Sequence, residues 1–417
     1  MNLKVKAEIF MTKFIEAYDQ HAEGRLSCEE AAELLGMSVS SFYRHRQAYE
    51  EEGLDGLIDR RIGKVPSNIA DEEELKFVTR LYAARYRLFS VKHFHEFAQR
   101  DHGLKRSYNW TKNKLTENGL ITKSTRGGKH RLRRERKPMT GMMLHQDGSR
   151  HRWLKNLDYD LDLIVTMDDA SSKITSCFLI EEEGTVSSFR GIQKTIESEG
   201  LFCSLYTDRG SHYFHTPEAN GKVDKSNLTQ VGRALRQLQI KHIAAYSPEA
   251  RGRSERMFGT LQNRLPQEFA LKCITTIEEA NKYIQEEYLP RHNAQFCVKP
   301  ASSASAFAAL PDFILLDDIL CIEEERIVQR DNTIRYNGLI LQIPAGSCRQ
   351  QYIKAEVKVR QYCDLSLAVF YGHLCIGRYD IAGRLQEKIK KLQKQEADCE
   401  RLFQQFLYNN KIGQMPC

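Results

Sequence analysis

The stretch LDLIVTMDDASSKITSCFLI (residues 161–180) contains two short apolar runs with a polar turn between them. Both runs are rich in β-branched and aromatic residues, which favour strands, whereas the aspartates and serines of the turn favour a tight reversal of the chain. A third run of the same kind, GMMLHQDGS (residues 141–149), precedes them. We therefore predict three consecutive strands that pair as an antiparallel meander.

Helix-like and strand-like patterns alternate after the meander. Apolar spacing of three and four residues predicts the helices, and short apolar runs predict the strands. In order, we expect a helix from about Val186 to Glu199, a strand in LFCSLYTDRG (201–210), a helix in LTQVGRALRQLQ (228–239), a strand in IKHIAAY (240–246), and a helix containing Phe258, Leu261 and Leu265. The order β-β-β-α-β-α-β-α is that of the α/β ribonuclease-H-like fold, which we assign to residues 140–300.

Three acidic residues stand at notable places in this order. Asp147 lies in the first strand, Asp208 ends the fourth, and Glu255 begins the helix after the fifth, within AYSPEARGRSER (residues 245–256). Ligands tend to bind beyond the carboxyl ends of strands, so neighbouring strands can bring the two aspartates within reach of one metal. Clustered carboxylates bind hard cations, and two Mg²⁺ or Mn²⁺ ions would suit phosphodiester chemistry.

Each acid taken alone could also be a surface residue. Asp168 and Asp169 compete for the same role, but both lie in the hairpin turn, where aspartate is favoured for turn geometry. We therefore interpret Asp168 and Asp169 as structural, and we assign both catalysis and metal binding to Asp147, Asp208 and Glu255.

The composition bounds the class of protein. A chain of 417 residues is expected to form several domains, and its formal charge of +7 is a modest basic excess. No apolar run approaches the roughly 18 residues of a membrane span, and the N-terminus lacks a secretory pattern, so a cytoplasmic location is expected. The 11 cysteines include no C-x-x-C pair and are interpreted as reduced thiols.

The N-terminal region has the pattern of a helix-turn-helix, which we assign to residues 1–65. In SCEEAAELLGMSVSSFYRHRQAYEEEG (residues 27–53), an apolar-periodic helix ends at Gly36, and Ser38 caps a second helix. That second helix would present polar and basic side chains to a DNA groove. A plain helical hairpin is the alternative. The side chains expected to contact DNA are Ser40, Tyr43, Arg44 and Arg46.

A second helix-turn-helix is predicted for residues 66–122, from SVKHFHEFAQRDHG (90–103) and SYNWTKNKLTENG (107–119). Tyr108 and Lys112 are its candidate DNA contacts. A basic linker follows at residues 123–139, with eight Lys or Arg against one Glu between residues 123 and 137. Such a segment is often simply solvated, but it also suits a phosphate backbone. Its candidate contacts are Lys129, Arg131, Arg133 and Arg134.

Several stretches together resemble bacterial insertion-sequence transposases with a retroviral-integrase-like DDE core, closest to the group labelled ISNCY. The resemblance runs roughly from residue 10 to residue 380. It is carried by LHQDGSRHRWL (144–154), IVTMDDASSKI (164–174), LYTDRGSHYF (205–214) and AYSPEARGRSERMFGTLQNRL (245–265). In that family, the acids that match Asp147, Asp208 and Glu255 are metal ligands.

The resemblance implies a DNA transposase that binds terminal inverted repeats, cleaves the phosphodiester at the element's ends and joins the 3′-hydroxyl to target DNA. Arg251, Arg253 and Arg256 would hold phosphates near the site. It also implies at least a homodimer on double-stranded DNA, in a bacterial nucleoid. The interval of 47 residues from Asp208 to Glu255 is wider than in retroviral integrases, and residues 215–227 are expected to form the inserted loop.

The C-terminal third is predicted to form further domains. The small residues of ASSASAFAAL (301–310) indicate a linker, and short alternating strands with a turn at Asn337-Gly338 predict an SH3-like β-barrel at residues 315–380. Heptad spacing predicts a helix at residues 381–410 that would form a coiled coil or pack on a partner subunit.

Two other functions remain open from the sequence. A catalytically inactive DNA-binding regulator would share the N-terminal motifs but would have no physical reason to keep three acids. A ribonuclease-H-like nuclease acting on hybrids would not need two helix-turn-helix units.

Overall fold

The computed structural model describes residues 3–58, 71–122, 135–217, 221–224, 226–246, 252–345 and 350–386. The chain divides into two compact units, Met1–Leu81 and Tyr82–Cys417. Within the described ranges, no helix combines the length and the apolarity that a bilayer span requires. Some predictions fall outside these ranges: the DNA contacts Lys129, Arg131, Arg133, Arg134 and Arg251, and the terminal helix beyond residue 386.

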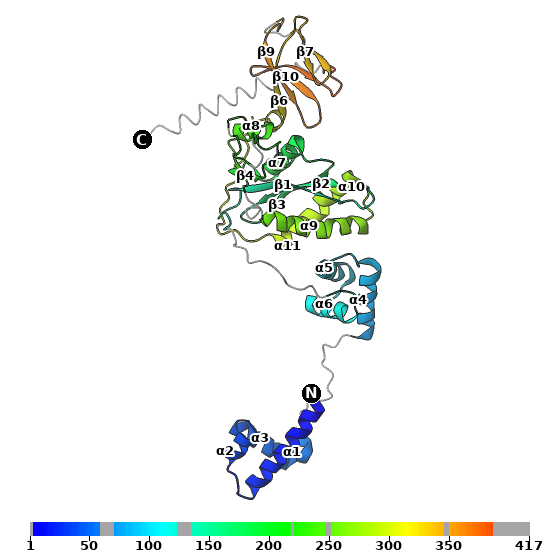
Figure 1. Cartoon of the computed structure of the whole chain (residues 1–417), viewed down its shortest axis with the longest axis vertical. Coiled ribbons are helices and arrows are strands. Elements are labelled where there is room, and N and C mark those ends of the chain that lie inside the picture. The colour runs from blue at the N-terminus through cyan, green and yellow to red at the C-terminus, as the bar shows by residue number, and fades with distance from the viewer. Residues whose placement is uncertain are drawn as a thin grey trace, which may run out of the picture. The chain divides into compact units, whose positions relative to one another are not determined.

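The first unit contains the predicted helix-turn-helix. Its helices are α1 (Leu3–Ala22), α2 (Cys28–Leu34) and α3 (Val39–Glu52), followed by the short 3₁₀ helix η1 (Gly53–Leu57) (Figure 1). Ser27 caps α2 in a capping box with Glu30, and Ser38 caps α3 through Ser41 N. Phe14 and Phe42 are fully buried at the centre of the unit.

A second group of helices follows, also as predicted. These are α4 (Glu72–Arg85), α5 (Val91–His102) and α6 (Tyr108–Glu117). Ser90 and Ser107 cap α5 and α6, and Gly103 ends α5 in the left-handed conformation with φ of 67°.

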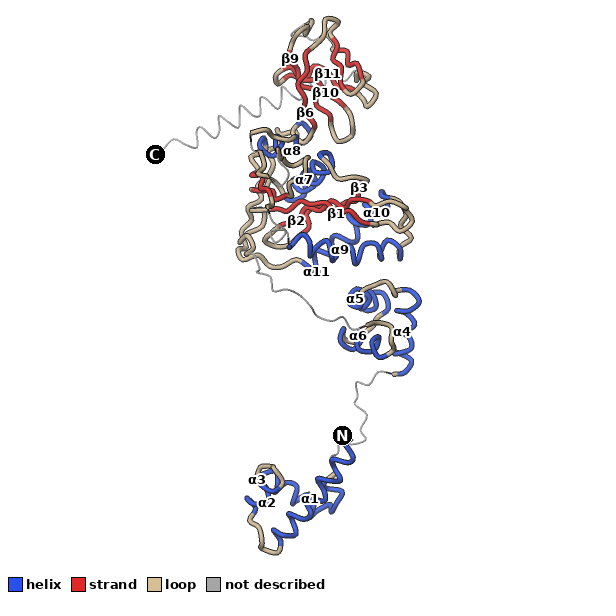
Figure 2. Tube along the Cα trace, viewed as in Figure 1, coloured by secondary structure: helices blue, strands red, loops and turns tan. Residues whose placement is uncertain are grey.

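A five-stranded sheet forms the centre of the second unit (Figure 2). Its order is β3-β2-β1-β4-β5, with β1, β2 and β3 antiparallel and β4 and β5 parallel to β1. The meander and the ribonuclease-H-like order predicted from the sequence are therefore both present. The strands are β1 (Leu144–His151), β2 (Leu161–Asp168), β3 (Ile174–Ile180), β4 (Ser204–Thr207) and β5 (Lys241–Ala244).

Helices cover both faces of this sheet. Leu144 and Leu205 point to the face covered by α7 (Thr185–Glu199) and α8 (Gln230–Gln237). Leu163 and Val165 point to the opposite face, which α9 (Gly252–Leu271) covers together with the helical run that follows it. This run consists of α10 (Ile277–Tyr283), the π-helical turn η3 (Ile284–Tyr288) and α11 (Leu289–Phe296).

The composition of the small-residue segment 301–310 predicts a linker, but the segment is packed against the core. Its backbone pairs with the core, because Ala306 N donates to Thr140 O at 2.8 Å and Ala308 N donates to Leu201 O at 2.9 Å. Small side chains allow two backbones to approach this closely. A loop can have the same composition, so composition alone does not predict the pairing.

The C-terminal strands follow the predicted hairpin chemistry, with Asn337 and Gly338 both at positive φ (45° and 79°). The predicted SH3-like β-barrel is not seen as a closed barrel among the described residues of this region. Among the described residues, the strands form two separate sheets around one apolar cluster, and no ladder joins the two. The four-stranded sheet contains β11 (Leu374–Tyr379), β10 (Leu367–Tyr371), β9 (Glu356–Gln361) and β6 (Ile322–Ile327), and the other contains β7 (Thr333–Tyr336) and β8 (Leu339–Gln342); a 3₁₀ turn, η4 (Leu316–Asp318), precedes them.

Candidate active site

The three acids singled out in the sequence line one cavity. Asp147, Asp208 and Glu255 all contribute to a cavity of about 630 Å³. Parallel pairing places His145 opposite Tyr206, and each of these residues precedes its acid by two positions. Because alternate residues of a strand share a face, Asp147 and Asp208 lie level with each other on the face that α9 covers.

Glu255 reaches the cavity from the first turn of α9. Phe258, Gly259 and Gln262 also line the cavity, so the residues at spacings of three, four and seven from Glu255 form one helix face. Helix α9 is tied to the central strand β1, since Gln262 Nε2 donates to Ser149 Oγ at 3.0 Å. The cavity is therefore walled by β1, the end of β4 and one face of α9.

The acids share the cavity without forming a compact cluster. Within the described ranges, no group of three or more His, Cys, Asp or Glu side chains is close enough to hold an ion as placed. Ionised carboxylates repel one another at short range, and Glu255 is exposed, so its side chain can remain apart. In chemistry the donor set fits a hard cation, because all three side chains offer carboxylate oxygens.

Other polar groups around the cavity were not found by sequence reasoning. Arg209 lines it, and its guanidinium lies over the Tyr246 ring at 5.3 Å while Nη1 donates to Gly221 O at 2.8 Å. The position of Arg209 directly after Asp208 was the available signal.

Asp168 behaves as the turn residue that was predicted. Its Oδ2 accepts from Ser171 N and Oγ, both at 2.7 Å, and its Oδ1 accepts from Gly141 N at 2.9 Å. Asp169 is different, because its fully buried carboxylate leaves the turn and accepts from His145 Nε2 at 2.8 Å and from Arg253. The interpretation of Asp169 as a turn residue alone is therefore incomplete.

The arginines around Glu255 do not share one role. Arg253, expected to hold DNA phosphate, is turned inward to Asp169, and its side chain is only 14% exposed. Arg256 is exposed beside Glu255. At the start of α9, Arg253 is therefore turned inward and Arg256 outward. The sequence did not distinguish the two.

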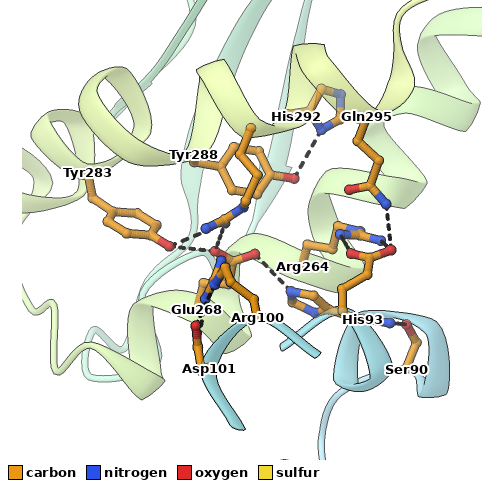
Figure 3. A network of polar contacts seen from close by, with 12 residues as sticks. Ser90, His93, Arg100, Asp101, Arg264, Glu268, Tyr283, Tyr288, His292 and Gln295 are labelled. Carbon is orange, nitrogen blue, oxygen red and sulfur yellow. Dashed lines mark hydrogen bonds and ion pairs between the residues drawn. The ribbon is translucent and has the colours of Figure 1, made fainter. Parts of the chain in front are cut away.

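The other end of α9 is held by a buried polar network (Figure 3). Glu268 is fully buried, and its Oε1 accepts from His93 Nε2 of α5 at 2.8 Å. Its Oε2 accepts from Tyr283 Oη at 2.5 Å and from Arg291. Beside it, Arg264 of α9 donates to both oxygens of Glu96 at 2.6 and 3.0 Å. The network joins α5 to the helix that carries Glu255.

Charges in this network follow from burial and hydrogen bonding. Desolvation acts most strongly on Glu268 and would raise its pKa, but hydrogen bonds from His93 and Tyr283 and the charge of Arg291 bring that pKa below its usual value. Desolvation lowers the pKa of His93, and the Glu268 hydrogen bond only partly opposes this. Glu268 is therefore ionised and His93 is neutral near neutral pH, with the imidazole N–H donating.

In the helix-turn-helix, the candidate DNA contacts separate into two groups. Ser40, Tyr43 and Arg44 are exposed on one face of α3, and Gln47, not chosen from the sequence, completes the spacing of that face. Arg46 lies off this face, where it pairs with Glu50 at 2.8 Å and contacts His21 of α1 at 3.2 Å. A basic residue within a helix can face its own domain, and spacing around the helix decides which one does.

The second helical group has a cavity of about 900 Å³ along α6. Tyr108 and Lys112, both chosen from the sequence, line it. Asn109, Asn113 and Lys92 line it as well and were not chosen. Their amides and ammonium can donate hydrogen bonds, which suits an anionic or hydrogen-bonding partner.

Comparison with known proteins identifies relatives of this chain. A winged helix-turn-helix family model matches residues 15–75. The protein named "Putative transposase y4bF" of Sinorhizobium fredii (strain NBRC 101917 / NGR234) is 27% identical over 366 residues, which are 86% of this chain and 78% of that protein. The transposase for insertion sequence IS1202 of Streptococcus pneumoniae is 24% identical over 394 residues, which cover 86% of this chain and 82% of that protein.

Over most of its length, the chain is similar to insertion-sequence transposases. This similarity confirms the resemblance drawn from the sequence motifs, and the family match confirms the first helix-turn-helix. Solved structures similar to this chain include the HTLV-2 integrase catalytic core with magnesium, in its dimeric form (17% identity, TM-score 0.27, covering 36% of this chain and 88% of that chain). Another is a simian T-cell lymphotropic virus intasome in complex with the PP2A regulatory subunit B56 gamma (14% identity, TM-score 0.31, covering 70% of this chain and 91% of that chain).

Replacing Glu268 with Ala should destabilise the second unit by about 3–5 kcal/mol, because the buried His93 and Tyr283 would lose their acceptor and Arg291 its ion pair. Denaturant unfolding followed by tryptophan fluorescence measures this, since Trp153 is buried in the cluster that α9 packs against. The control is Glu278→Ala, at an exposed position of α10, which should change stability by less than about 0.5 kcal/mol. Equal effects of the two variants would contradict a structural role for the network.

Acid should weaken the α5–α9 contact through His93. Its folded-state pKa lies below the unfolded value, so stability is complete above about pH 6.5 and falls as the pH drops below it. His93→Gln should therefore reduce the slope of unfolding free energy against pH, by at most about 1.4 kcal/mol per pH unit, the value for one proton. His373→Gln, at an exposed position, is the control, and an unchanged slope for His93→Gln would refute the assignment.

Proposed function

We propose that this chain is a DNA transposase whose catalytic cavity is the one lined by Asp147, Asp208 and Glu255. The observation that carries the proposal is the convergence of these three acids from distant segments on one cavity of a ribonuclease-H-like sheet. Similarity to transposases over 86% of the chain supports the reaction class.

The reaction would proceed in two steps at the same cavity. In the first, a water oxygen attacks the phosphorus at the element's end, the bond to the 3′ oxygen breaks, and that oxygen leaves as a 3′-hydroxyl. In the second, this hydroxyl attacks a phosphorus of target DNA and displaces a target 3′ oxygen. In each step, an incoming oxygen from water or from the 3′-hydroxyl replaces a 3′ oxygen on phosphorus, so no covalent protein intermediate is required.

Asp147, Asp208 and Glu255 would hold Mg²⁺ or Mn²⁺, which when bound supply positive charge to the attacking and leaving oxygens, two ions being the arrangement common to such sites. Arg209, on the cavity wall, and the exposed Arg256 would attract the DNA phosphates. Glu255 would complete the ligand set by a side-chain movement, because it is exposed and α9 fixes its backbone.

Recognition of the terminal inverted repeats would fall to the helical units. The exposed face of α3 with Ser40, Tyr43 and Arg44 has the polar and basic character of a recognition helix. The cavity along α6 with Tyr108 and Lys112 offers a second contact. Because two element ends must be joined in one event, the active assembly would contain at least two copies of the chain.

Asp208→Asn tests the catalytic assignment. The amide keeps the shape but loses the charge, so cleavage of terminal-repeat DNA in Mg²⁺ should fall about 10²-fold or more, as for loss of a preorganised charge-stabilising group, while binding of that DNA remains. Asp160→Asn is the matched control, because Asp160 is an exposed acid outside the cavity. Wild-type cleavage by Asp208→Asn would refute the assignment. Repeat binding without cleavage by the wild type, in Mg²⁺ or Mn²⁺, would instead support a DNA-binding regulator.

Arg44→Ala and Lys112→Ala test the DNA-binding surfaces. Each change should weaken binding to terminal-repeat DNA by about 1–3 kcal/mol, or reduce the salt slope by about one if the lost contact is to phosphate. Arg25→Ala, in which an exposed arginine paired with Glu23 is removed from the same unit as Arg44, should leave affinity unchanged. Gel-shift titrations at several salt concentrations give both quantities, and equal losses for all three variants would argue against specific surfaces.

A further inference from the structure

Helix α9 runs along β1, and its contacts occur in the same order as the residues of the strand. Asp169 accepts hydrogen bonds both from Arg253 of α9 and from His145 of β1. Gln262 of α9 donates to Ser149, further along β1. Further along, Lys155 Nζ donates to Gln267 Oε1 at 2.7 Å. Among these contacts, the ion pair of Asp169 with Arg253 lies nearest to Glu255 along the helix.

The Asp169 carboxylate ties together three separate segments. Oδ1 accepts from His145 Nε2 of β1 at 2.8 Å and from Arg253 Nη1 of α9. Oδ2 accepts from the backbone N of Lys137, ahead of β1, at 2.8 Å. The turn that carries Asp169 is itself braced, since Arg136 Nη1 donates to Asp169 O and Ser172 Oγ, both at 2.8 Å.

Asp169, His145 and Arg253 together form what we call the clamp. Its groups are buried, and it lies beside two of the three acids. Asp169 and His145 are 0% and 3% exposed, and Arg253 is 14% exposed. His145 precedes Asp147 by two residues on the same strand face, and Arg253 precedes Glu255 by two residues on α9. Tyr206, two residues before Asp208, packs its ring edge-on against His145 at 5.1 Å. One buried carboxylate is therefore connected to the backbone segments of all three acids.

We propose that Asp169 is a positioning residue: by holding Arg253 and His145, it fixes the rotation and the level of the first turn of α9 relative to β1, and so places Glu255 opposite Asp147 and Asp208. Asp169 does not touch the cavity and takes no part in the reaction itself. It acts because Arg253 and Glu255 lie on the same helical turn, so a shift of one carries the other. The consequence for catalysis rests on the proposed function, whereas the consequence for α9 does not.

Hydrogen–deuterium exchange on the full chain tests the positioning directly, without any reaction. Asp169→Asn and Arg253→Ala should each speed exchange of the amides in residues 252–258 by about tenfold or more, because each change removes the ion pair that ties the first turn of α9 to the Asp169 turn. Exchange in residues 262–271 should stay near wild type, because the Ser149 and Glu268 contacts remain. Arg253→Lys, which keeps a cation able to donate to the carboxylate, should recover part of the protection.

The matched control is Asp168→Asn, which removes the neighbouring buried acid of the same turn without touching α9. It should leave exchange of residues 252–258 unchanged. Unchanged exchange there in both Asp169→Asn and Arg253→Ala, or an equal rise in Asp168→Asn, would overturn the proposal.

A second measurement links the clamp to the acids. In Asp169→Asn, the Mn²⁺ concentration giving half-maximal cleavage of terminal-repeat DNA should rise about tenfold, while affinity for that DNA stays unchanged. A rise in exchange with an unchanged Mn²⁺ dependence would overturn the link to Glu255. If the wild type does not cleave, the proposed function fails, and the exchange result still decides whether Asp169 positions α9.

Discussion

The parallel pairing of β1 with β4 is the constraint on which the site depends. The two strands are separated by two further strands and a helix in the chain, and their pairing places His145 opposite Tyr206. Since alternate residues share a strand face, the aspartates two positions further on reach the same cavity. Everything else in the site consists of bringing a third carboxylate to these two.

That third carboxylate has to be supplied by a helix, and helices position side chains only as well as they are themselves held. Helix α9 is anchored near Glu255 by the Asp169–Arg253 pair and, further along, by the buried network around Glu268. Buried ion pairs are costly to desolvate and add little net stability, but they tolerate few alternative arrangements. Here they would hold the carboxylates close enough to bind cations, at a place where the acids alone would repel one another.

Local patterns predicted the parts of the fold whose cause is local. The meander, the order of strands and helices, the Ser38 cap and the Asn337-Gly338 turn all follow from periodicity and turn chemistry within a few residues. Asp208 and Glu255 could be located because that order fixes where the fourth strand ends and where the following long helix begins.

What could not be predicted depends on distant partners. Asp169 has the sequence context of a turn aspartate. Nothing near it in the sequence indicates that its partner is Arg253, 84 residues further along the chain. The inward turn of Arg46, the backbone pairing of residues 301–310 and the two separate C-terminal sheets likewise depend on packing between segments. Residue type predicts what a side chain can do, whereas these cases required knowing what it meets.

The most direct test of the central claim is anomalous diffraction at the manganese edge from crystals of the full-length chain with Mn²⁺ and terminal-repeat DNA. The account predicts manganese in the cavity with carboxylate oxygens of Asp147, Asp208 and Glu255 all among its ligands. Manganese bound elsewhere, or in the cavity with Glu255 outside the coordination sphere, would contradict it.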